Sequence, residues 1–225
     1  MTEQSGARPT IAIIGGTGDL GSGLAGRWAA AGYPIVLGSR ARDKAIAAAK
    51  EMTTVSGAAI TGDDNLSAAQ AADIVVIAVP YSNHDAILNE LKPALAGKIV
   101  VDAVVPLKPP KVSTVQLPEA GSAAAEAQRI LGDTVRLVTA FHNVGAAKLR
   151  GGGPIDCDVL VCGDDKDARD AVIALADAAG TRGVDGGALA NSVAAEALTS
   201  ILIGINRRYK VSNAGIRITG LPARE

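Results

Sequence analysis

The sequence is poor in aromatic residues, cysteine and histidine. Aromatic side chains make up 2% of its 225 residues, and it has two cysteines and two histidines. The cysteines, Cys157 and Cys162, lack the further cysteine or histidine pairs that complete zinc sites. We therefore expect two ordinary buried thiols and no metal site.

The sequence also lacks an excess of one charge and a long apolar run. A net charge of −1 gives no electrostatic reason to bind nucleic acid or an anionic membrane. No segment approaches the roughly 18 consecutive apolar residues of a membrane span, and the polar start MTEQSGARPT is unlike a signal peptide. These features predict a cytoplasmic protein with no nucleic-acid or membrane partner.

Short apolar runs rich in β-branched residues recur along the chain and predict strands. The runs are continuous rather than alternating, which is typical of strands buried on both faces of a parallel sheet. The predicted strands cover residues 10–14, 34–38, 58–61, 73–79, 98–104, 135–140, 157–163 and 181–185.

Segments between and after these runs, most of them rich in alanine, predict helices. They cover residues 21–32, 41–52, 83–95, 118–131, 164–180 and 188–208. Strands and helices that alternate in this way form right-handed βαβ units. The predicted fold class is α/β, a doubly wound, mostly parallel Rossmann sheet with a small C-terminal helical part.

A glycine-rich turn follows the first predicted strand. Gly16, Gly18 and Gly21 match the spacing G-x-G-x-x-G. We assign the tight turn to the first glycine, close approach to a pyrophosphate to the second, and helix–strand packing to the third. The N–H groups of the following helix would face the phosphates. This arrangement predicts a dinucleotide site, the alternative being a tight turn in an unrelated α/β protein.

The second predicted strand ends in Gly38, Ser39 and Arg40 rather than in an acidic residue. A carboxylate here accepts bonds from the ribose of NAD, and it would repel a 2′-phosphate. Ser39 and Arg40 would bind that phosphate, and Lys44, one helical turn further on, would add charge. The sequence therefore favours NADP over NAD; the alternative is that Arg40 and Lys44 only solvate a helix start.

The segment from Ile11 to Arg40 resembles the N-terminus of the NADPH-dependent reductases of coenzyme F-420, a deazaflavin. The similarity continues in order along the chain at VPYSNHDAI, IVVDAVVPL, AFHNVGAAKL, VLVCGDD and VDGGALANSVAAEALTSIL. The Cys-Gly-Asp-Asp and Asn-Ser segments are more specific than the glycine loop. The resemblance thus covers nearly the whole chain.

The resemblance implies an oxidoreductase that transfers a hydride between NADP(H) and coenzyme F-420, and a homo-oligomer, usually a dimer. With the fold prediction, it gives an NADP-binding Rossmann domain over residues 1–150. A smaller C-terminal α/β part with a long helix would follow over residues 151–225, packed on the first as one compact unit.

The resemblance also implies which residues contact the two cofactors. At the phosphates, including the 2′-phosphate, we expect Gly16, Thr17, Gly18, Asp19, Leu20, Gly21, Ser39, Arg40 and Lys44. At the nicotinamide half we expect Val79, Pro80, Val104 and Pro106, with Tyr81 and His84 beside them. The deazaflavin would lie over the segment that contains His142, Val144 and Ala146.

Several residues depart from the family pattern on the acceptor side. Tyr81 replaces an aromatic that is usually Trp, Asn143 replaces a small hydroxyl residue, and Gly145 replaces a proline. The segment 106–118 also differs. Two other functions therefore stay open: reduction by NADPH of another acceptor, such as a flavin, quinone, metal chelate, imine or small ketone, and NADP binding without catalysis.

Hydride transfer needs few catalytic side chains. When two cofactor rings are stacked with their reacting carbons about 3–3.5 Å apart, this orientation supplies most of the rate enhancement. His142, at the end of the sixth predicted strand, is the candidate catalytic residue, as a polar contact or proton donor to the acceptor. The alternative for His142 is a hydrogen-bonded loop residue. Asp102 is more simply a satisfied polar group of the interior.

Other acidic residues have simpler interpretations. Asp164 and Asp165 predict an N-cap pair for the helix that follows them. Glu196, on the apolar last helix, is expected to form hydrogen bonds at an interface.

Overall fold

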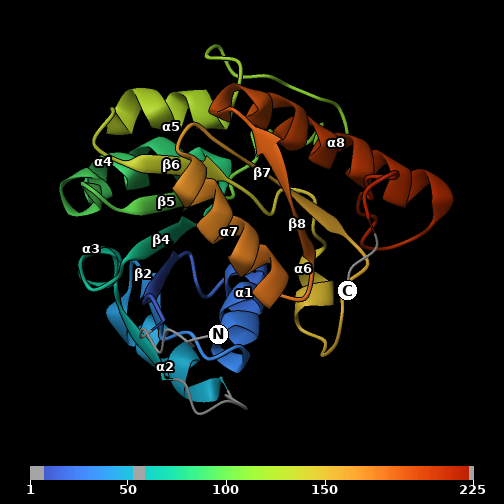
Figure 1. Ribbon diagram of the computed structural model, residues 1–225. Coiled ribbons are helices and arrows are strands. Elements are labelled where there is room, and N and C mark those ends of the chain that lie inside the picture. The colour runs from blue at the N-terminus through green and yellow to red at the C-terminus, as the bar shows by residue number, and fades with distance from the viewer. Residues whose placement is uncertain (1–7, 53–58, 223–225) are drawn as a thin grey trace.

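An eight-stranded sheet runs through the centre of the molecule (Figure 1). The computed structural model describes residues 8–52 and 59–222. The strands are β1 (Ile11–Ile14), β2 (Ile35–Ser39), β3 (Ile60–Asp64), β4 (Ile74–Ile77), β5 (Ile99–Asp102), β6 (Arg136–Thr139), β7 (Asp158–Gly163) and β8 (Arg182–Gly187). β1, β4 and β5 are buried along their whole length, as their continuous apolar runs predict.

The strand order is β3-β2-β1-β4-β5-β6-β7-β8, and all neighbours pair in parallel except β6 and β7. The predicted doubly wound, mostly parallel α/β fold is therefore confirmed. The strand order reverses between β1 and β4, the place where open sheets of this kind bind ligands. Because β1 to β6 are parallel, the loops that follow them lie along one edge of the sheet.

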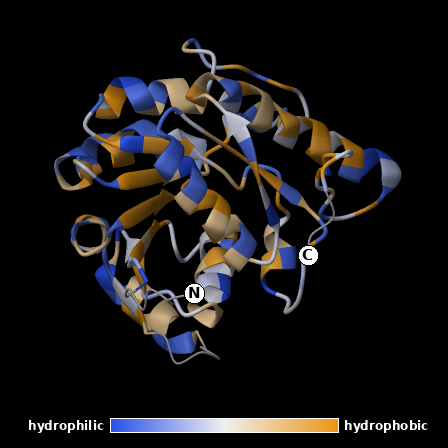
Figure 2. Ribbon diagram, in the orientation of Figure 1, coloured by the Kyte–Doolittle hydropathy of each residue, from blue (hydrophilic) through white to orange (hydrophobic). Residues whose placement is uncertain are grey.

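Helices cover both faces of this sheet. They are α1 (Asp19–Ala30), α2 (Arg42–Glu51), α3 (Asn65–Gln70), α4 (His84–Leu95), α5 (Ala123–Leu131), α6 (Ala146–Leu149), α7 (Lys166–Ala178) and α8 (Ser192–Tyr209), with short 3-10 turns η1 (Tyr81–Asn83) and η2 (Leu189–Asn191). One apolar cluster packs α1, α2 and α7 on one face, and a second packs α3, α4 and α5 on the other. Figure 2 shows hydrophobic strands between helices that carry hydrophilic residues.

Some elements have different ends from those predicted. The strands predicted over residues 73–79 and 98–104 end at Ile77 and Asp102, so the residues after them form loops. The helix predicted from residue 118 begins at Ala123, because Ser122 caps it by accepting a bond from Ala125 N. The strand predicted over residues 58–61 is observed over Ile60–Asp64, and the start of that prediction lies outside the described residues.

Two short helices have no counterpart in the prediction. α3 has 6 residues and is capped by Asp64, whose side chain accepts a bond from Ser67 N. α6 has 4 residues. Segments this short hold too few turns for a helical period to be visible in the sequence. Both follow strands of the parallel part of the sheet, at the edge where ligands bind.

The chain after Arg150 adds two strands to the same sheet and the helices α7 and α8. Asp165 caps α7 as predicted, but Asp164 instead accepts a bond from Leu189 N. Gly180 follows α7 with a φ of 85°, which fits its predicted role as a helix stop. Cys157 and Cys162 are free and buried, so this prediction is confirmed.

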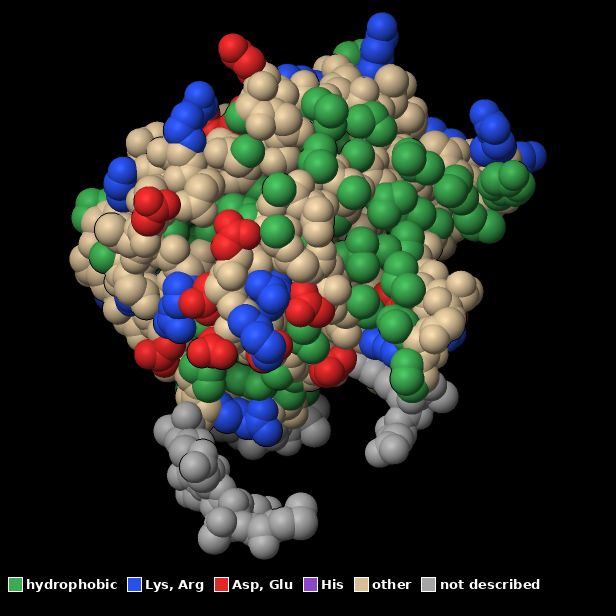
Figure 3. Space-filling model, turned by 45° about the horizontal axis from the view of Figure 1, so that its top comes forward, with side chains coloured by type: hydrophobic (Ala, Val, Ile, Leu, Met, Phe, Trp, Pro, Cys, Tyr) green, Lys and Arg blue, Asp and Glu red, His purple; other side chains and the backbone are tan. Residues whose placement is uncertain are grey.

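α8 combines a buried side with an exposed apolar side. Within the described part of the chain, the segment Leu189–Tyr209 is long and apolar enough, by length and composition alone, to cross a membrane. Its Glu196 is buried, however, and the carboxylate accepts bonds from Ala123 N and Ala124 N at 2.7 and 3.0 Å. Glu196 therefore binds the start of α5 within the chain rather than an interface. Ile201 and Ile205 are exposed, and Figure 3 shows apolar side chains gathered along this part of the surface.

Candidate cofactor and acceptor sites

The glycine-rich turn joins β1 to α1 beside β4. Gly15 has a φ of 83°, and a Cβ built there would lie 2.5 Å from the carbonyl oxygen of Ala78. Only glycine fits both the left-handed backbone and this close approach. The tight turn predicted at Gly16 is therefore centred one residue earlier, at Gly15.

The three glycines of the motif have different surroundings. A Cβ on Gly16 would lie 2.8 Å from Ile13 O, and one on Gly21 would lie 2.6 Å from Gly15 O. Gly21 thus lets α1 pack against the turn, as predicted. Gly18 caps α1 without a side-chain hydrogen bond, so the first N–H groups of the helix remain available to an anion.

A cavity of about 210 Å³ opens beside this turn. Its walls come in part from the turn after β1 and the loop after β4, the two strands between which the strand order reverses. Six predicted residues line it: Thr17, Gly18, Ser39, Arg40, Val79 and Pro80. Sequence reasoning missed five others: Gly15, Asn65, Ala78, Asn83 and Ile87.

The other predicted cofactor residues lie outside this cavity. Gly16 and Gly21 allow close backbone packing within and against the turn but do not line the cavity. Asp19 forms an ion pair with Arg150. Lys44 is an exposed residue of α2. The rest of the set that does not line the cavity is Leu20, Tyr81, His84, Val104 and Pro106.

The charge around the cavity suits a phosphate. Arg40 is exposed at its rim, and no carboxylate is among the lining residues. Ser39 Oγ accepts a bond from Ala41 N at 3.3 Å, so its hydroxyl proton remains free to donate. These two residues offer the cation and the donor that recognise a 2′-phosphate.

Asn65 is the clearest residue that the sequence analysis missed. Its side chain is 3% exposed and lines the cavity, and its Oδ1 has no hydrogen-bond partner among the described residues. A Cβ on Gly38, at the end of β2, would lie 3.2 Å from that oxygen. A buried unpaired acceptor on a residue that lines a cavity fits a hydroxyl or amine donor on a bound ligand. The sequence analysis missed Asn65 because it did not predict the helix α3, which begins at this residue.

The loops after β4 and β5 carry the residues expected at the nicotinamide. Val104 is buried, and its N–H donates to Asp102 Oδ1 at 3.0 Å. Tyr81 donates its hydroxyl to Glu126 Oε2 at 2.9 Å, and Lys108 Nζ lies 5.8 Å from the centre of the Tyr81 ring. Burial, together with Glu126, raises the pKa of Tyr81, so its hydroxyl stays protonated as a donor.

His84 is fully buried at the start of α4. Its Nε2 lies 2.8 Å from Asp102 Oδ2. Its Nδ1 has no hydrogen-bond partner and lies 3.9 Å from Asp85 Oδ1. Burial opposes the charged form of His84, but the bond to Asp102 and the neighbouring carboxylates outweigh it and raise its pKa. The imidazole thus lies among acidic groups from three elements.

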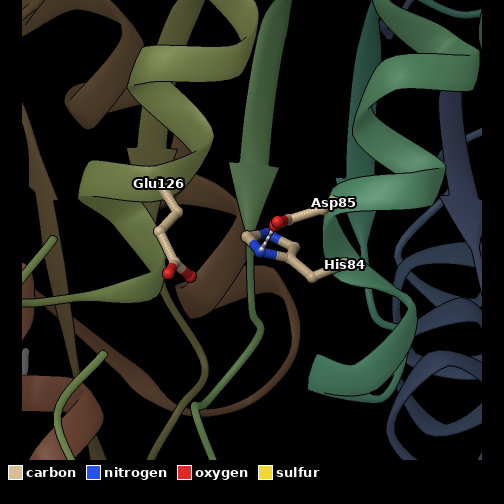
Figure 4. Close-up of side chains that lie close together, drawn as sticks. All are labelled: His84, Asp85 and Glu126. Carbon is tan, nitrogen blue, oxygen red and sulfur yellow. Dashed lines mark ion pairs between the residues drawn. The ribbon is translucent and has the colours of Figure 1, made fainter. Parts of the chain in front are cut away.

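Figure 4 shows the carboxyl groups of Asp85 and Glu126 on the same side of α4 as the His84 ring. One ligand atom from each of the three residues lies within 4.8 Å of the others, the spacing of a loose metal-ligand group. Glu126 is already bonded to Tyr81, however, and the Nε2 of His84 is paired with Asp102.

His142 lies beyond the end of β6, as predicted. Within the part of the chain that the structure describes, neither of its ring nitrogens has a hydrogen-bond partner, and Asn143 Oδ1 is also buried and unpaired. Burial lowers the pKa of His142 to about 4, with Asp102 opposing the shift, so the imidazole is neutral at pH 7. A neutral imidazole offers one donor and one acceptor to a ligand.

A second cavity, of about 160 Å³, borders the His142 segment. Its walls come from His142 to Gly145, from the middle of α8 and from the C-terminal tail. A Cβ on Gly145 would lie 2.6 Å from Asn213 in that tail. This contact gives a physical reason for glycine at position 145, where the family resemblance predicts proline. Of the predicted acceptor residues, His142 and Val144 line this cavity, while Ala146 begins α6.

The fold and the cavity at the strand reversal define a dinucleotide-binding protein of the Rossmann class. A model of the family "NADP oxidoreductase coenzyme F420-dependent" matches residues 10–106. The chain is 42% identical to an F420-dependent NADP reductase of Methanocaldococcus jannaschii, over 94% of this chain and 98% of the relative. It is 39% identical to an F420-dependent NADP reductase of Methanothermobacter marburgensis, over 94% of this chain and 99% of the relative.

Solved structures agree with this similarity. A candidate F420-dependent NADP reductase from Arthrobacter sp. FB24 superposes with a TM-score of 0.77 at 25% identity, covering 94% of this chain and 99% of that one. The chain therefore belongs to the family of F420-dependent NADP reductases.

Proposed function

We propose that the protein is an oxidoreductase that transfers a hydride reversibly between NADP(H) and coenzyme F-420. The observation that carries this proposal is similarity at about 40% identity, over nearly the full length of both chains, to F420-dependent NADP reductases. The cavity at the strand reversal supports it independently, because its lining combines a glycine cradle with Ser39 and Arg40 and contains no carboxylate.

The protein's part in NADP binding follows from this cavity. Thr17, Gly18 and the first turn of α1 offer donors to the pyrophosphate. Ser39 and Arg40 bind the 2′-phosphate and discriminate against NAD, with Lys44 adding long-range attraction from α2. Asn65 Oδ1 accepts a bond from the adenosine half, beside the end of β2.

The nicotinamide half lies along the loops after β4 and β5. Val79, Pro80, Val104 and Pro106 border it with apolar surface and exclude water. When both cofactors are bound, their rings supply the hydride chemistry, so the protein's contribution is orientation. No acidic or basic side chain has to change charge for that contribution.

The acceptor lies against the His142 segment. Its neutral imidazole, with both ring nitrogens unpaired, is positioned to hydrogen-bond the acceptor ring system. Val144 and Ala146 supply apolar contact beside it. We propose His142 as the polar contact to the acceptor rather than as an obligate acid.

The experiment is a bleaching assay. Purified protein mixed anaerobically with NADPH and oxidised coenzyme F-420 is expected to bleach the deazaflavin absorbance, with NADH far less effective. The absence of bleaching at every pH from 5 to 9 would overturn the proposal. If NADPH oxidation then depends on a flavin, quinone, metal chelate, imine or ketone instead, the acceptor is a different one; tight NADPH binding without any turnover indicates a non-catalytic protein.

We further propose that the protein is a cytoplasmic homodimer. The exposed apolar side of α8, with Ile201, Ile205 and Tyr209, supports dimerisation through this helix. Residues 1–150 would form the NADP-binding part, and residues 151–225 would contribute the smaller part and the dimer contact.

A further inference from the structure

Two loops on the nicotinamide side follow β4 and β5, beyond the backbone bond from Ala103 N to Ile77 O. One contains residues 79–83 and leads from β4 into α4, and the other contains residues 103–108 and follows β5. The predicted contacts Val79, Pro80, Val104 and Pro106 are divided between them. Since hydride transfer depends on the distance between two rings, the relative position of these loops sets how well the nicotinamide is aimed.

One buried carboxylate connects the two loops. Asp102 Oδ2 pairs with His84 Nε2 at 2.8 Å, and Asp102 Oδ1 accepts the N–H of Val104 at 3.0 Å. His84 is the first residue of α4, and Val104 lies two residues beyond β5. The pair is sealed from solvent, with His84 at 0% and Asp102 at 1% exposure. Water therefore does not compete for these bonds.

Stability alone does not explain a buried polar pair at this position. Well-packed apolar side chains usually stabilise a core at least as well as a buried ion pair, whose desolvation is unfavourable. A directional pair does fix geometry, because its atoms must meet at a defined distance and angle. Further groups face the pair: Asp85 on α4, Glu126 on α5 and Glu196 on α8.

We infer that His84 is a positioning residue that, through Asp102, fixes the position of the two nicotinamide-side loops relative to each other. This role rests on the proposed NADP-dependent hydride transfer and deepens it. His84 does not touch NADP itself; it acts by fixing Asp102 and thereby the backbone at Val104. His84, which we expected beside the nicotinamide, thus acts on it indirectly and does not line the cavity.

The first test compares three single variants. His84→Leu is expected to lower kcat by about tenfold to a hundredfold while the Kd for NADPH changes by less than about twofold, because the phosphate end is untouched. His84→Gln, which keeps a donor near the position of Nε2, is expected to restore most of the rate. Leu88→Ala, at a buried position on the same helix, is the control and should lower the melting temperature without lowering kcat.

The double variant His84→Leu/Asp102→Asn separates positioning from stability. It removes the unpaired charge that His84→Leu leaves behind but keeps an acceptor for Val104, so the melting temperature should recover while kcat stays low. Recovery of kcat together with the melting temperature would overturn the inference, as would an unchanged kcat in His84→Leu.

A readout without acceptor keeps this test independent of the proposed function. The fluorescence of bound NADPH reports the surroundings of the nicotinamide. It should change in His84→Leu and in the double variant, and return in His84→Gln. Wild-type protein that fails to bleach coenzyme F-420 contradicts the proposed function alone. Unchanged NADPH fluorescence in both His84→Leu and the double variant contradicts the positioning role.

Discussion

Ser39 and Arg40 are the residues that we propose to discriminate between the two nicotinamide dinucleotides. They stand at the end of β2, where an acidic residue would bind the ribose of NAD, and both line the cavity beside the glycine turn. A guanidinium matches a phosphate in geometry as well as in charge. The proposed selectivity therefore depends on Arg40, an exposed side chain.

Arg40→Ala should weaken NADPH far more than NADH. The lost charge-assisted contact is worth about 1.5–3 kcal/mol, or roughly 10- to 150-fold in Kd. Titration of both dinucleotides by fluorescence measures this difference. Arg42→Ala is the matched control, because Arg42 pairs with Asp63 and does not line the cavity. Equal loss for both dinucleotides would mean that Arg40 does not recognise the phosphate.

Asn65→Ala should weaken NADPH and NADH alike. Its Oδ1 has no partner in the described ranges 8–52 and 59–222, so its removal should take away the proposed ligand contact, worth about 1 kcal/mol or roughly a fivefold change in Kd. The same titrations measure it. A change for NADPH alone, or no change for either dinucleotide, would place Asn65 outside the shared adenosine contacts.

The junction between α5 and α8 is built on a buried acid. Glu196 satisfies two N–H groups at the start of α5, where the helix dipole favours negative charge. Burial nevertheless raises the pKa of Glu196 to about 7, with Asp102 adding to the shift and the two backbone bonds opposing it. The contact between these two helices is thus sensitive to pH near neutrality.

Glu196→Gln should change how stability depends on pH. Because the folded state holds the Glu196 proton more tightly than the unfolded state, this group contributes stability at low pH that is lost as pH rises through about 7. The melting temperature of the variant minus that of the wild type should therefore increase between pH 5 and pH 8. The raised pKa of His84 makes stability fall with rising pH in the same direction, but His84 is present in both proteins, so its effect cancels in the difference. A difference that stays constant across this range would contradict the assignment.

The sequence predicts whole elements better than their ends. Continuous apolar runs identify the strands because burial on both faces requires them. The same runs continue past Ile77 and Asp102 into apolar residues of the loops, and periodicity does not show where pairing stops. The helix α3 escapes prediction because its 6 residues are too few to show a helical period, and the cavity residue Asn65 is missed with it.

At the scale of the molecule, the parallel strands bring distant motifs to one edge. The glycine turn, the loops after β4 and β5 and the His142 segment follow neighbouring strands in the order β1, β4, β5 and β6. That arrangement was predictable from alternating strands and helices. The bonds that fix the loops were not, because His84–Asp102 and Tyr81–Glu126 join residues whose pairing depends on side-chain direction.

The exposed side of α8 predicts self-association. Ile201→Glu and Ile205→Glu would each place a charge in an apolar contact, and desolvation of that charge should drive a dimer toward monomer. Light scattering after size exclusion measures the mass. The wild type should run as a dimer and the variants as monomers, whereas a monomeric wild type would remove α8 as an interface.

The most direct test of the account follows the hydride itself. NADPH that carries deuterium at the transferable position is incubated with the protein and oxidised coenzyme F-420 in ordinary water, and the reduced deazaflavin is analysed by mass spectrometry. Direct transfer between two stacked rings predicts that the deuterium appears in the reduced deazaflavin, and that unlabelled NADPH in heavy water leaves that carbon unlabelled. Loss of the label to solvent, or no reduced deazaflavin at all, would contradict the central claim.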